Sequence, residues 1–384
     1  MPENWQTGGF GLYVHWPFCD SKCPYCDFNS HVVQAVDQAR WADALCAEIR
    51  RFAAETPGRI LGSIFFGGGT PSLMTPATVD RVITTARESW AFSNDIEITL
   101  EANPSSVEAN RFAGYAQAGV NRLSIGVQSL RDGALRRLGR RHSADDARHA
   151  VTLAKSIFRR VSLDLIYARQ DQTVGQWHDE LTDALSMELS HYALYQLTIE
   201  QGTVFGARHA RGQMRGLPDE KCAVGLWNMT QKVCEDAGLP SYEVSNHARH
   251  GEESRHNLTY WSGGDWVGVG PGAHGRLSVA SGRVATEALS APGAWLRAVE
   301  TKGAGDVDRS ILSKDAQDEE YLIMGLRTSE GIDLERVSGQ MAEHVVQRAS
   351  ALESEGLVTL NGSTLRVTPA GRLLLNSVIG ALCS

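Results

Sequence analysis

The chain has 384 residues, with 42% hydrophobic and 21% charged side chains and a formal net charge of −8. This acidic balance argues against a broad electrostatic grip on nucleic acid or anionic membranes, and no apolar run is long enough to span a bilayer. The first residues, MPENWQTGGF, lack the basic and apolar segments of a secretory signal, so we expect a cytoplasmic protein with one large domain and one smaller domain.

Short apolar runs alternate with helical stretches over the first 200 residues. Helical periodicity is clear at 37–55 and at 76–90, where Pro76 suits a first helical position. Nearly continuous apolar strands with helices between them predict a parallel sheet covered on its faces. About six such units predict an α/β fold with an open, partial (βα)6 barrel over residues 1–200. The expected strands are 11–16, 63–68, 96–102, 122–128, 161–167 and 191–199.

Three cysteines, Cys19, Cys23 and Cys26, follow the first expected strand with the spacing C-x3-C-x2-C. An iron–sulfur cube has four irons, so three protein thiolates would leave one iron open to an external ligand. The same thiols could hold zinc with His15 or His31 as the fourth ligand, or could cluster without a metal. Zinc motifs usually pair their cysteines as two separated knuckles, so the x3-then-x2 spacing within eight residues favours a [4Fe–4S] cluster. The loop follows the first strand at the carboxyl-terminal mouth of the expected barrel, where such folds place their chemistry.

The texture of the sequence changes twice after residue 200. Residues 201–312 are rich in Gly, His, Trp and Tyr, and we expect them to extend the barrel with much loop. Residues 313–384 suggest helix, helix, short hairpin and helix, which predicts a winged-helix-like C-terminal domain. Its acidic segments DAQDEE and ESEGL provide no basic patch, so we expect a packing or substrate-covering role and no nucleic-acid partner.

Several motifs together resemble the radical S-adenosylmethionine (SAM) superfamily: the cysteine motif, FFGGGTPS after the second strand, and the βα order. Within it YVHWPFCDSKCPYCDFNS, LEANP, SIGVQS, LDLIY and HNLTYW resemble the oxygen-independent coproporphyrinogen III oxidase-like branch. The resemblance implies that SAM chelates the open iron through its amino and carboxylate groups. The positions that match SAM contacts are Tyr13, Gly68, Gly69, Thr70, Glu101, Gln128, Arg140 and Asp164.

The branch divides two residues after the third cysteine. The oxidase carries a further cysteine there, whereas this chain has Phe28, and its CDF sequence is most similar to the heme chaperone subfamily HemW. That resemblance implies a chaperone that binds heme, SAM and the cluster and passes heme to unidentified acceptor proteins, with no catalytic residue. An oxygen-independent coproporphyrinogen III oxidase-like enzyme of porphyrin biosynthesis is the alternative. A third and weaker hypothesis is a winged-helix regulator that uses the cluster as a sensor.

The HNLTYW segment supplies the expected heme contacts, because it offers an imidazole and flat aromatic faces within six residues. By resemblance the contacts are His256, Asn257, Tyr260 and Trp261, and other histidines compete for the iron: His191, His247, His250 and His274. After LDLIY the branch often continues Gly-Leu-Pro, whereas this chain has Ala168, Arg169 and Gln170. This departure predicts a different shape for the loop beside the expected SAM site. The sequence leaves monomer and homodimer both open.

Overall fold

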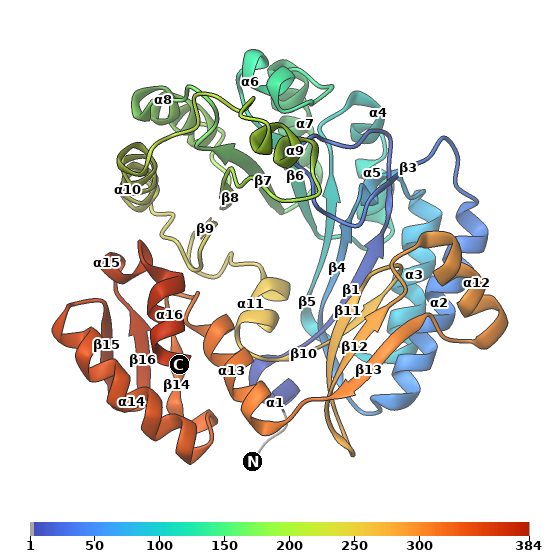
Figure 1. The fold of residues 1–384 in the computed structure, drawn as a ribbon. Helices are drawn as coiled ribbons and strands as arrows, with labels where there is room; N and C mark the ends of the chain where they lie inside the picture. Colours follow the sequence, from blue (N-terminus) through green and yellow to red (C-terminus); the bar gives the residue numbers. More distant parts are fainter. Residues whose placement is uncertain (1–3, 384) are drawn as a thin grey trace.

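A curved sheet runs through the molecule and forms the expected barrel (Figure 1). The computed structural model describes residues 4–383, and within them this sheet has 11 strands in the order β13-β12-β11-β10-β1-β4-β5-β6-β7-β8-β9. The six strands from β1 to β8 in this order pair in parallel, which confirms the partial (βα)6 barrel. Their bounds are β1 Phe10–Trp16, β4 Ile60–Gly68, β5 Ala91–Ala102, β6 Arg122–Gln128, β7 Arg160–Tyr167 and β8 His191–Gln196.

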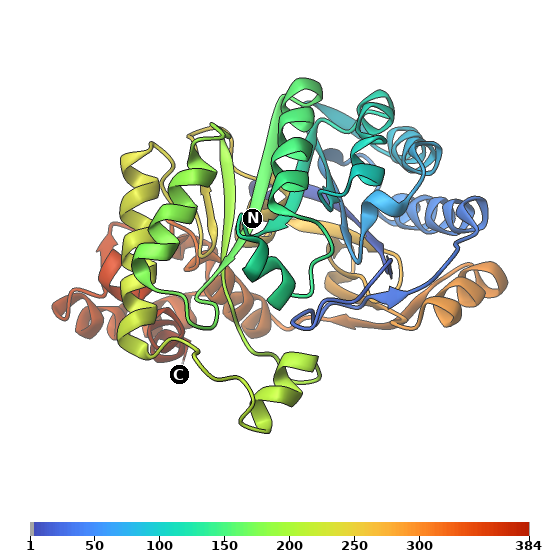
Figure 2. The ribbon, with the colours of Figure 1, turned by 90° about the horizontal axis from the view of Figure 1, so that it is seen from above.

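Helices surround the outer face of this curved sheet (Figure 2). Asp37 accepts a backbone N–H at the start of α2, and Thr75 caps α3 directly before Pro76. Ser143 forms a capping box with Asp146 in front of α7. The expected helices 37–55 and 76–90 are confirmed to within one residue at each end. The bounds are α2 Gln38–Glu55, α3 Pro76–Ser89, α4 Ser106–Ala109, α5 Phe112–Gln117, α6 Asp132–Arg137, α7 Ala144–Ile157 and α8 Val174–Leu185.

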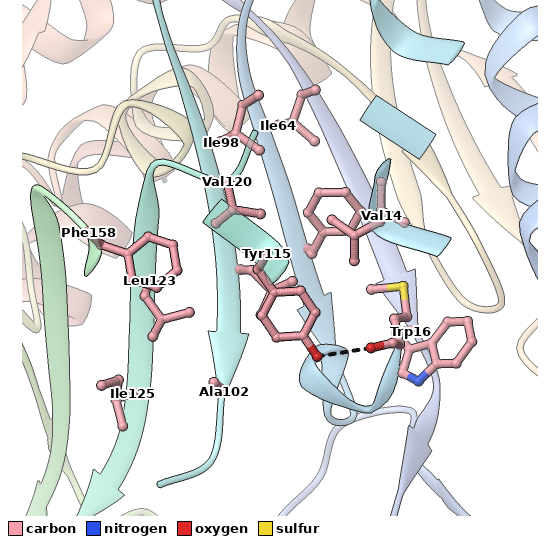
Figure 3. Close-up of a cluster of buried hydrophobic side chains, with 14 of the residues drawn as sticks. Val14, Trp16, Ile64, Ile98, Ala102, Tyr115, Val120, Leu123, Ile125 and Phe158 are labelled. Carbon is pink, nitrogen blue, oxygen red and sulfur yellow. Dashed lines mark hydrogen bonds between the residues drawn. The ribbon is translucent and has the colours of Figure 1, made fainter. Parts of the chain in front are cut away.

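Outward side chains of the strands fill the space between the sheet and these helices (Figure 3). Val14 and Trp16 of β1 are fully buried there. Tyr115 of α5 reaches into the same layer, and its hydroxyl lies 2.7 and 2.9 Å from the carbonyl oxygens of Ser72 and Met74. Its ring therefore contributes apolar area while its polar tip stays satisfied.

The inner face of the same strands is more polar. Alternation along β1 turns Tyr13 and His15 toward the lumen, where Tyr13 stacks on Phe65 of β4 with ring centroids 6.3 Å apart. The same alternation on β5 and β7 presents Glu101 and Asp164, each partly accessible, to the lumen. The barrel thus combines an apolar shell with a lumen that carries titratable groups.

Residues 201–312 hold more regular structure than the sequence predicts. β10 pairs in parallel with β1, and β11, β12 and β13 continue the sheet as antiparallel strands. The expectation of much loop is therefore wrong for residues 265–311, because the short run DWVGV finds its partner strand far upstream in the chain. The bounds are α9 Val204–Ala210, α10 Glu220–Asp236, β9 Asn246–Ala248, α11 Arg255–Trp261, β10 Asp265–Val269, β11 His274–Val279, β12 Gly282–Ala288, α12 Pro292–Lys302 and β13 Asp306–Ile311.

The C-terminal residues form a small unit with its own core, which includes Leu322, Val345 and Leu365. Two helices, a β15–β16 hairpin joined by β14, and a last helix confirm the winged-helix-like arrangement. No helix in residues 4–383 is long and apolar enough to cross a membrane. The bounds are α13 Lys314–Gly325, β14 Ile332–Asp333, α14 Gly339–Ser354, β15 Val358–Asn361, β16 Thr364–Val367, α15 Pro369–Arg372 and α16 Leu375–Cys383.

Candidate cofactor site at the barrel mouth

The cysteine loop follows β1 at the carboxyl end of the barrel strands, as the sequence predicts. Cys19 ends the short strand β2 (Phe18–Cys19), which pairs with β3 (His31–Val32) and closes the loop. The Cys26 amide donates to the Cys23 carbonyl at 3.1 Å. Cys19 is buried and the other two thiols are half-buried, so the loop shields them without sealing them from a ligand.

Polar groups from other elements point at two of the sulfurs. Thr70 Oγ1 donates to Cys19 Sγ at 3.3 Å, and Arg140 Nη1 donates to Cys23 Sγ at 3.4 Å. Burial raises the pKa of the Cys19 thiol, the bond from Thr70 opposes this shift, and the neighbouring Cys26 and Cys23 thiols add to it. A guanidinium is the partner that a negative thiolate needs, so these residues fit the thiolate ligands of an iron–sulfur cluster.

The two histidines of the zinc alternative are both hydrogen-bonded to Asn29 of the cysteine loop. His15 Nε2 lies 2.9 Å from the Asn29 carbonyl and its Nδ1 lies 3.0 Å from the Tyr13 hydroxyl, while His31 Nε2 lies 3.0 Å from Asn29 Oδ1. In the described part of the chain, no three His, Cys, Asp or Glu side chains are grouped closely enough to hold one metal ion. In the described residues the three thiols and either histidine therefore form no ready zinc site, and the [4Fe–4S] cluster stays a prediction.

Asn29 ties the cysteine loop to the rest of the barrel. Its Nδ2 donates to the carbonyls of Pro271 and Ser290, each at 2.9 Å, while its own carbonyl and Oδ1 meet the two histidines. These bonds join the loop to the segments that flank β11 and β12. The loop is thus held in place before any cofactor binds, which lowers the ordering cost of binding.

An arc of hydrogen bonds connects the first and second cysteines. Arg140 Nη2 donates to Asn103 Oδ1 at 2.5 Å, and Asn103 Nδ2 donates to Thr70 Oγ1 at 3.4 Å. Since Arg140 and Thr70 also bond Cys23 and Cys19, the three side chains of Arg140, Asn103 and Thr70 form one continuous support between the two cysteines. Two of the expected SAM positions are therefore neighbours of the thiols, as the resemblance implies.

Two of the expected glycines lie against the cysteine loop and β1. A Cβ on Gly68 would lie 2.7 Å from the His15 ring, and one on Gly69 would lie 2.7 Å from the Phe18 carbonyl oxygen. Gly68 also has φ of +110°, which side chains rarely adopt. Packing within the protein thus already requires both glycines. Their contact with SAM stays a prediction.

Glu101 and Asp164 form a carboxylate pair in the lumen. Burial raises the pKa of Glu101 to about 8, and nearby Asp164 adds to the shift while the Gly68 amide opposes it. Burial also raises the pKa of Asp164 to about 7, against the bond from Ser124 Oγ at 3.0 Å. Close to neutral pH the pair is therefore only partly ionised, and it can both donate to and accept from a polar ligand.

Gln128 ends β6 with φ of +66°, in the left-handed region that is uncommon for residues other than glycine. Of the expected SAM positions, Gly68, Glu101 and Gln128 lie in the last two residues of β4, β5 and β6, and Gly69 and Thr70 follow β4 directly. Tyr13 and Asp164 lie in the middle of β1 and β7, and Arg140 reaches Cys23 from the connection after α6. Sequence reasoning missed Asn29 and Asn103 as supporting residues. Both lie inside the CDFNS and LEANP motifs, which were the available signal.

The HNLTYW segment forms helix α11, away from the cysteine loop (Figure 1). His256 is buried, with Nδ1 2.8 Å from Ser63 Oγ and Nε2 2.6 Å from the Tyr260 hydroxyl. Its ring stacks on Phe65 at 5.2 Å, and burial lowers its pKa to about 3. Both ring nitrogens of His256 are thus hydrogen-bonded, so in this arrangement neither is free to bind heme iron as an axial ligand.

Asn257 and Trp261 of this segment also lie on α11 and are partly covered by the protein. The Asn257 amide donates to the N-cap Ser254, and both Asn257 and Trp261 are half-buried. Among the competing histidines, His191 and His247 are buried, whereas His250 and His274 are exposed. The geometry therefore leaves the heme contacts of HNLTYW as a prediction.

Comparison with known proteins identifies the family. Residues 13–183 match the family model described as the radical SAM superfamily, and residues 312–374 match the HemN C-terminal domain. The chain is 39% identical to the bovine (Bos taurus) radical S-adenosyl methionine domain-containing protein 1, mitochondrial, over 97% of this chain and 87% of that protein. It is 34% identical to the heme chaperone HemW of Haemophilus influenzae, over 96% of each chain.

The fold also matches a solved structure. The Escherichia coli coproporphyrinogen III oxidase HemN, described as a radical SAM enzyme, superposes with a TM-score of 0.81 at 22% identity, over 98% of this chain and 90% of that one. This likeness supports the barrel and the C-terminal unit alone, because identity is low. Together with the full-length relatives, it shows that the chain belongs to the radical SAM superfamily, in the branch that includes the heme chaperone HemW and HemN.

Proposed function

We propose that this protein is a heme chaperone that carries a [4Fe–4S] cluster on Cys19, Cys23 and Cys26 and binds SAM at the barrel mouth. It would bind heme and pass it to acceptor proteins. The observation that carries the proposal is the full-length similarity to curated heme chaperones, together with Phe28 at the position where the oxidase has a cysteine. Phe28 is 59% exposed on the cysteine loop and offers no thiol.

The residues of the site have distinct expected roles. A bound cluster would supply an open iron that the amino and carboxylate groups of SAM can chelate. Arg140 and Thr70 would orient and stabilise the thiolates, because they already donate to two of the sulfurs. Glu101 and Asp164 would bind hydroxyl or ammonium groups of SAM in the lumen, where their partial protonation lets them act as donor or acceptor. The location in the cytoplasm stays a prediction, since the bovine relative is named as mitochondrial.

One pair of assays separates the chaperone from the oxidase. Anaerobically reconstituted protein is titrated with hemin, and in parallel it receives SAM, a reductant and coproporphyrinogen III. We expect saturable hemin binding without decarboxylation. Formation of protoporphyrinogen over many turnovers, without saturable hemin binding, would contradict the proposal and favour the oxidase. Measuring 5′-deoxyadenosine in the same reactions reports whether SAM is cleaved.

A further inference from the structure

Two arginine-rich segments flank the cysteine loop. Residues 133–142 and 201–217 together contain seven arginines and no aspartate or glutamate, although the whole chain has 45 acidic side chains against 37 lysines and arginines. Six of the seven are exposed, and we call these six the basic rim: Arg136, Arg137, Arg141, Arg208, Arg211 and Arg215. On a protein of net negative charge, such a one-sided group creates a local positive potential.

The fold brings both segments against the cysteine loop. The Phe205 amide at the start of α9 donates to the Pro24 carbonyl at 2.8 Å. Beneath the arginines, Leu138 of the first segment packs with Phe205 and Met214 of the second, and Tyr25 of the cysteine loop joins this small apolar cluster. Helix α9 lies beside the loop of the cysteines in both views (Figure 1, Figure 2). The basic rim therefore surrounds one side of the expected iron–sulfur cluster.

Few carboxylates neutralise the basic rim. Within residues 4–383, only Arg137 among the six pairs with a carboxylate, that of Asp171 at 3.7 Å. Asp132 at the start of α6 is already an acceptor for a backbone amide of α7, at 2.8 Å. The cysteine loop carries two exposed carboxylates, Asp20 and Asp27, but neither forms an ion pair with the rim in the described part of the chain. Five guanidiniums are thus free to meet an external anion.

Helix α9 presents its part of the basic rim around an exposed apolar side chain. Val204, Arg208 and Arg211 follow each other at helical spacing, and Val204 is 53% exposed. A cation near the end of a helix stabilises the helix dipole, which could explain Arg208 but not Arg136 and Arg141 on the neighbouring segment. An apolar centre with charges of one sign around it is suited to a protein of opposite charge.

We propose that the basic rim is the docking surface for a small acidic electron-transfer protein that reduces the [4Fe–4S] cluster. The inference rests on the cluster of the proposed function. Arg140, in the same segment as Arg136 and Arg141, donates to Cys23 Sγ at 3.4 Å, so the docking surface is continuous with a cluster ligand. One electron passes from the reduced cofactor of the partner to the oxidised cluster, and no bond forms or breaks. Small charged contacts suit such a partner, because attraction speeds its arrival and a small interface lets it leave.

Nucleic acid is the other large anion that a basic rim could bind. Proteins that bind single strands add aromatic side chains on which bases stack. Among Phe, Tyr and Trp, the two segments contain only Phe205, which is buried under the arginines. The position of the rim beside the cysteine loop, and its lack of stacking faces, therefore favour the electron-transfer protein.

The test measures how fast a reduced acidic flavodoxin reduces the anaerobically reconstituted cluster, by stopped flow at low and high salt. Arg208→Glu/Arg211→Glu reverses two charges of the rim, and Arg50→Glu/Arg348→Glu makes the same change in net charge at exposed arginines of α2 and α14. We expect the wild-type rate constant to fall steeply with salt. At low salt the rim variant should be slower by at least about tenfold, the lower limit for electrostatic steering, and the control should react nearly as fast as wild type.

Photoreduced deazaflavin, a small reductant that needs no docking surface, provides the second arm. We expect it to reduce the cluster to the same extent in all three proteins, measured by electron paramagnetic resonance. If it does so, but flavodoxin reacts equally fast with wild type and the rim variant at every salt concentration, the inference fails while the cluster stands. If wild type holds no reducible cluster, the proposed function itself fails. Saturable binding of a single-stranded oligoribonucleotide that only the rim variant loses, with equal flavodoxin rates, would assign the rim to nucleic acid instead.

Discussion

At the residue scale, the thiols and their two donors define the site. Thr70 and Arg140 come from different connections of the barrel, yet each donates to a cysteine sulfur. Hydrogen bonds of this kind tune a thiolate and position it for iron. The three cysteines should therefore act together, and the remaining cysteines should not contribute.

Cys19→Ala should abolish the brown iron–sulfur absorbance after anaerobic reconstitution, because one of three protein ligands is lost. Cys383→Ala, at the far end of the C-terminal unit, is the matched control and should retain iron and sulfide. The measurement is iron and sulfide content with the visible spectrum. Full retention of both in the Cys19 variant would contradict the cluster assignment.

The lumen carboxylates should make stability depend on pH. The pKa of Glu101 is about 8 in the folded state, whereas its ordinary value is near 4.5. Between these two pH values Glu101 is ionised in the unfolded chain but largely protonated in the folded protein. The free energy of unfolding therefore falls as pH rises from about 4.5 toward 8. Glu101→Gln should therefore raise the free energy of unfolding by about 1 kcal/mol or more at pH 8 and by much less at pH 5.

Urea unfolding of the cofactor-free protein at the two pH values measures this effect. Glu88→Gln, on the exposed side of α3, is the control and should change stability equally at both. A gain for Glu101→Gln that is the same at pH 5 and pH 8 would show that Glu101 is not held against ionisation.

Sequence reasoning found the residues with distinctive chemistry and missed those that only support them. The cysteines follow a strand that is readable from its apolar run, and Glu101 and Asp164 lie within two others. Asn29 and Asn103 have no pattern of their own, and their roles depend on partners that only the folded chain brings near.

At the element scale, helix α11 carries the HNLTYW motif. The family resemblance of this motif suggests heme binding, but its contacts in the structure hold the helix against the barrel. The buried Glu97 carboxylate accepts from the Arg255 amide in the first turn of α11, at 3.0 Å. His256 then links this helix to β4 through Ser63 and to Tyr260 within the helix. Helix α11 is thereby fixed to the inner side of the barrel.

His256→Ala should lower the free energy of unfolding by roughly 2–3 kcal/mol, because it leaves a cavity and two unpaired hydroxyls. His250→Ala, which removes an exposed imidazole from the turn before α11, should have no measurable effect. Denaturant unfolding and hemin titration of both variants give the answer. A His256 variant with unchanged stability and lost hemin binding would support ligation by this histidine over a structural role.

Elements with local signals were predictable, and elements defined by distant partners were not. The Asp37 cap and the apolar spacing of α2 are both visible in the sequence, and its predicted start was one residue early. β10 has only five residues beside glycines, and it is a strand because β1 provides an open edge. Local propensity is weak in such a short run, so tertiary pairing decides its state.

At the scale of the whole molecule, the C-terminal unit attaches to the barrel by polar contacts. Arg276 of β11 pairs with Glu320 of α13 at 2.9 Å, and the Ser329 amide donates to the Tyr242 carbonyl at 2.9 Å. The unit has its own core, separate from the core of the barrel. Its winged-helix-like form therefore raises the question of whether it contacts nucleic acid or only the barrel.

The charge of the C-terminal unit indicates that it contacts the barrel and not nucleic acid. Residues 313–384 contain six basic and ten acidic side chains, and several of the basic ones are already engaged, such as Arg336 over the Tyr321 ring and Arg366 with Glu330. Nucleic-acid binding requires unpaired cations that can release counterions from phosphates. The unit should therefore show no saturable binding to duplex DNA in fluorescence anisotropy at about 0.15 M salt. Neutralising the DAQDEE segment by Glu319→Gln and Glu320→Gln should weaken the contact with Arg276 without creating affinity for DNA. Tight binding of DNA by the wild-type protein would instead support the winged-helix regulator hypothesis.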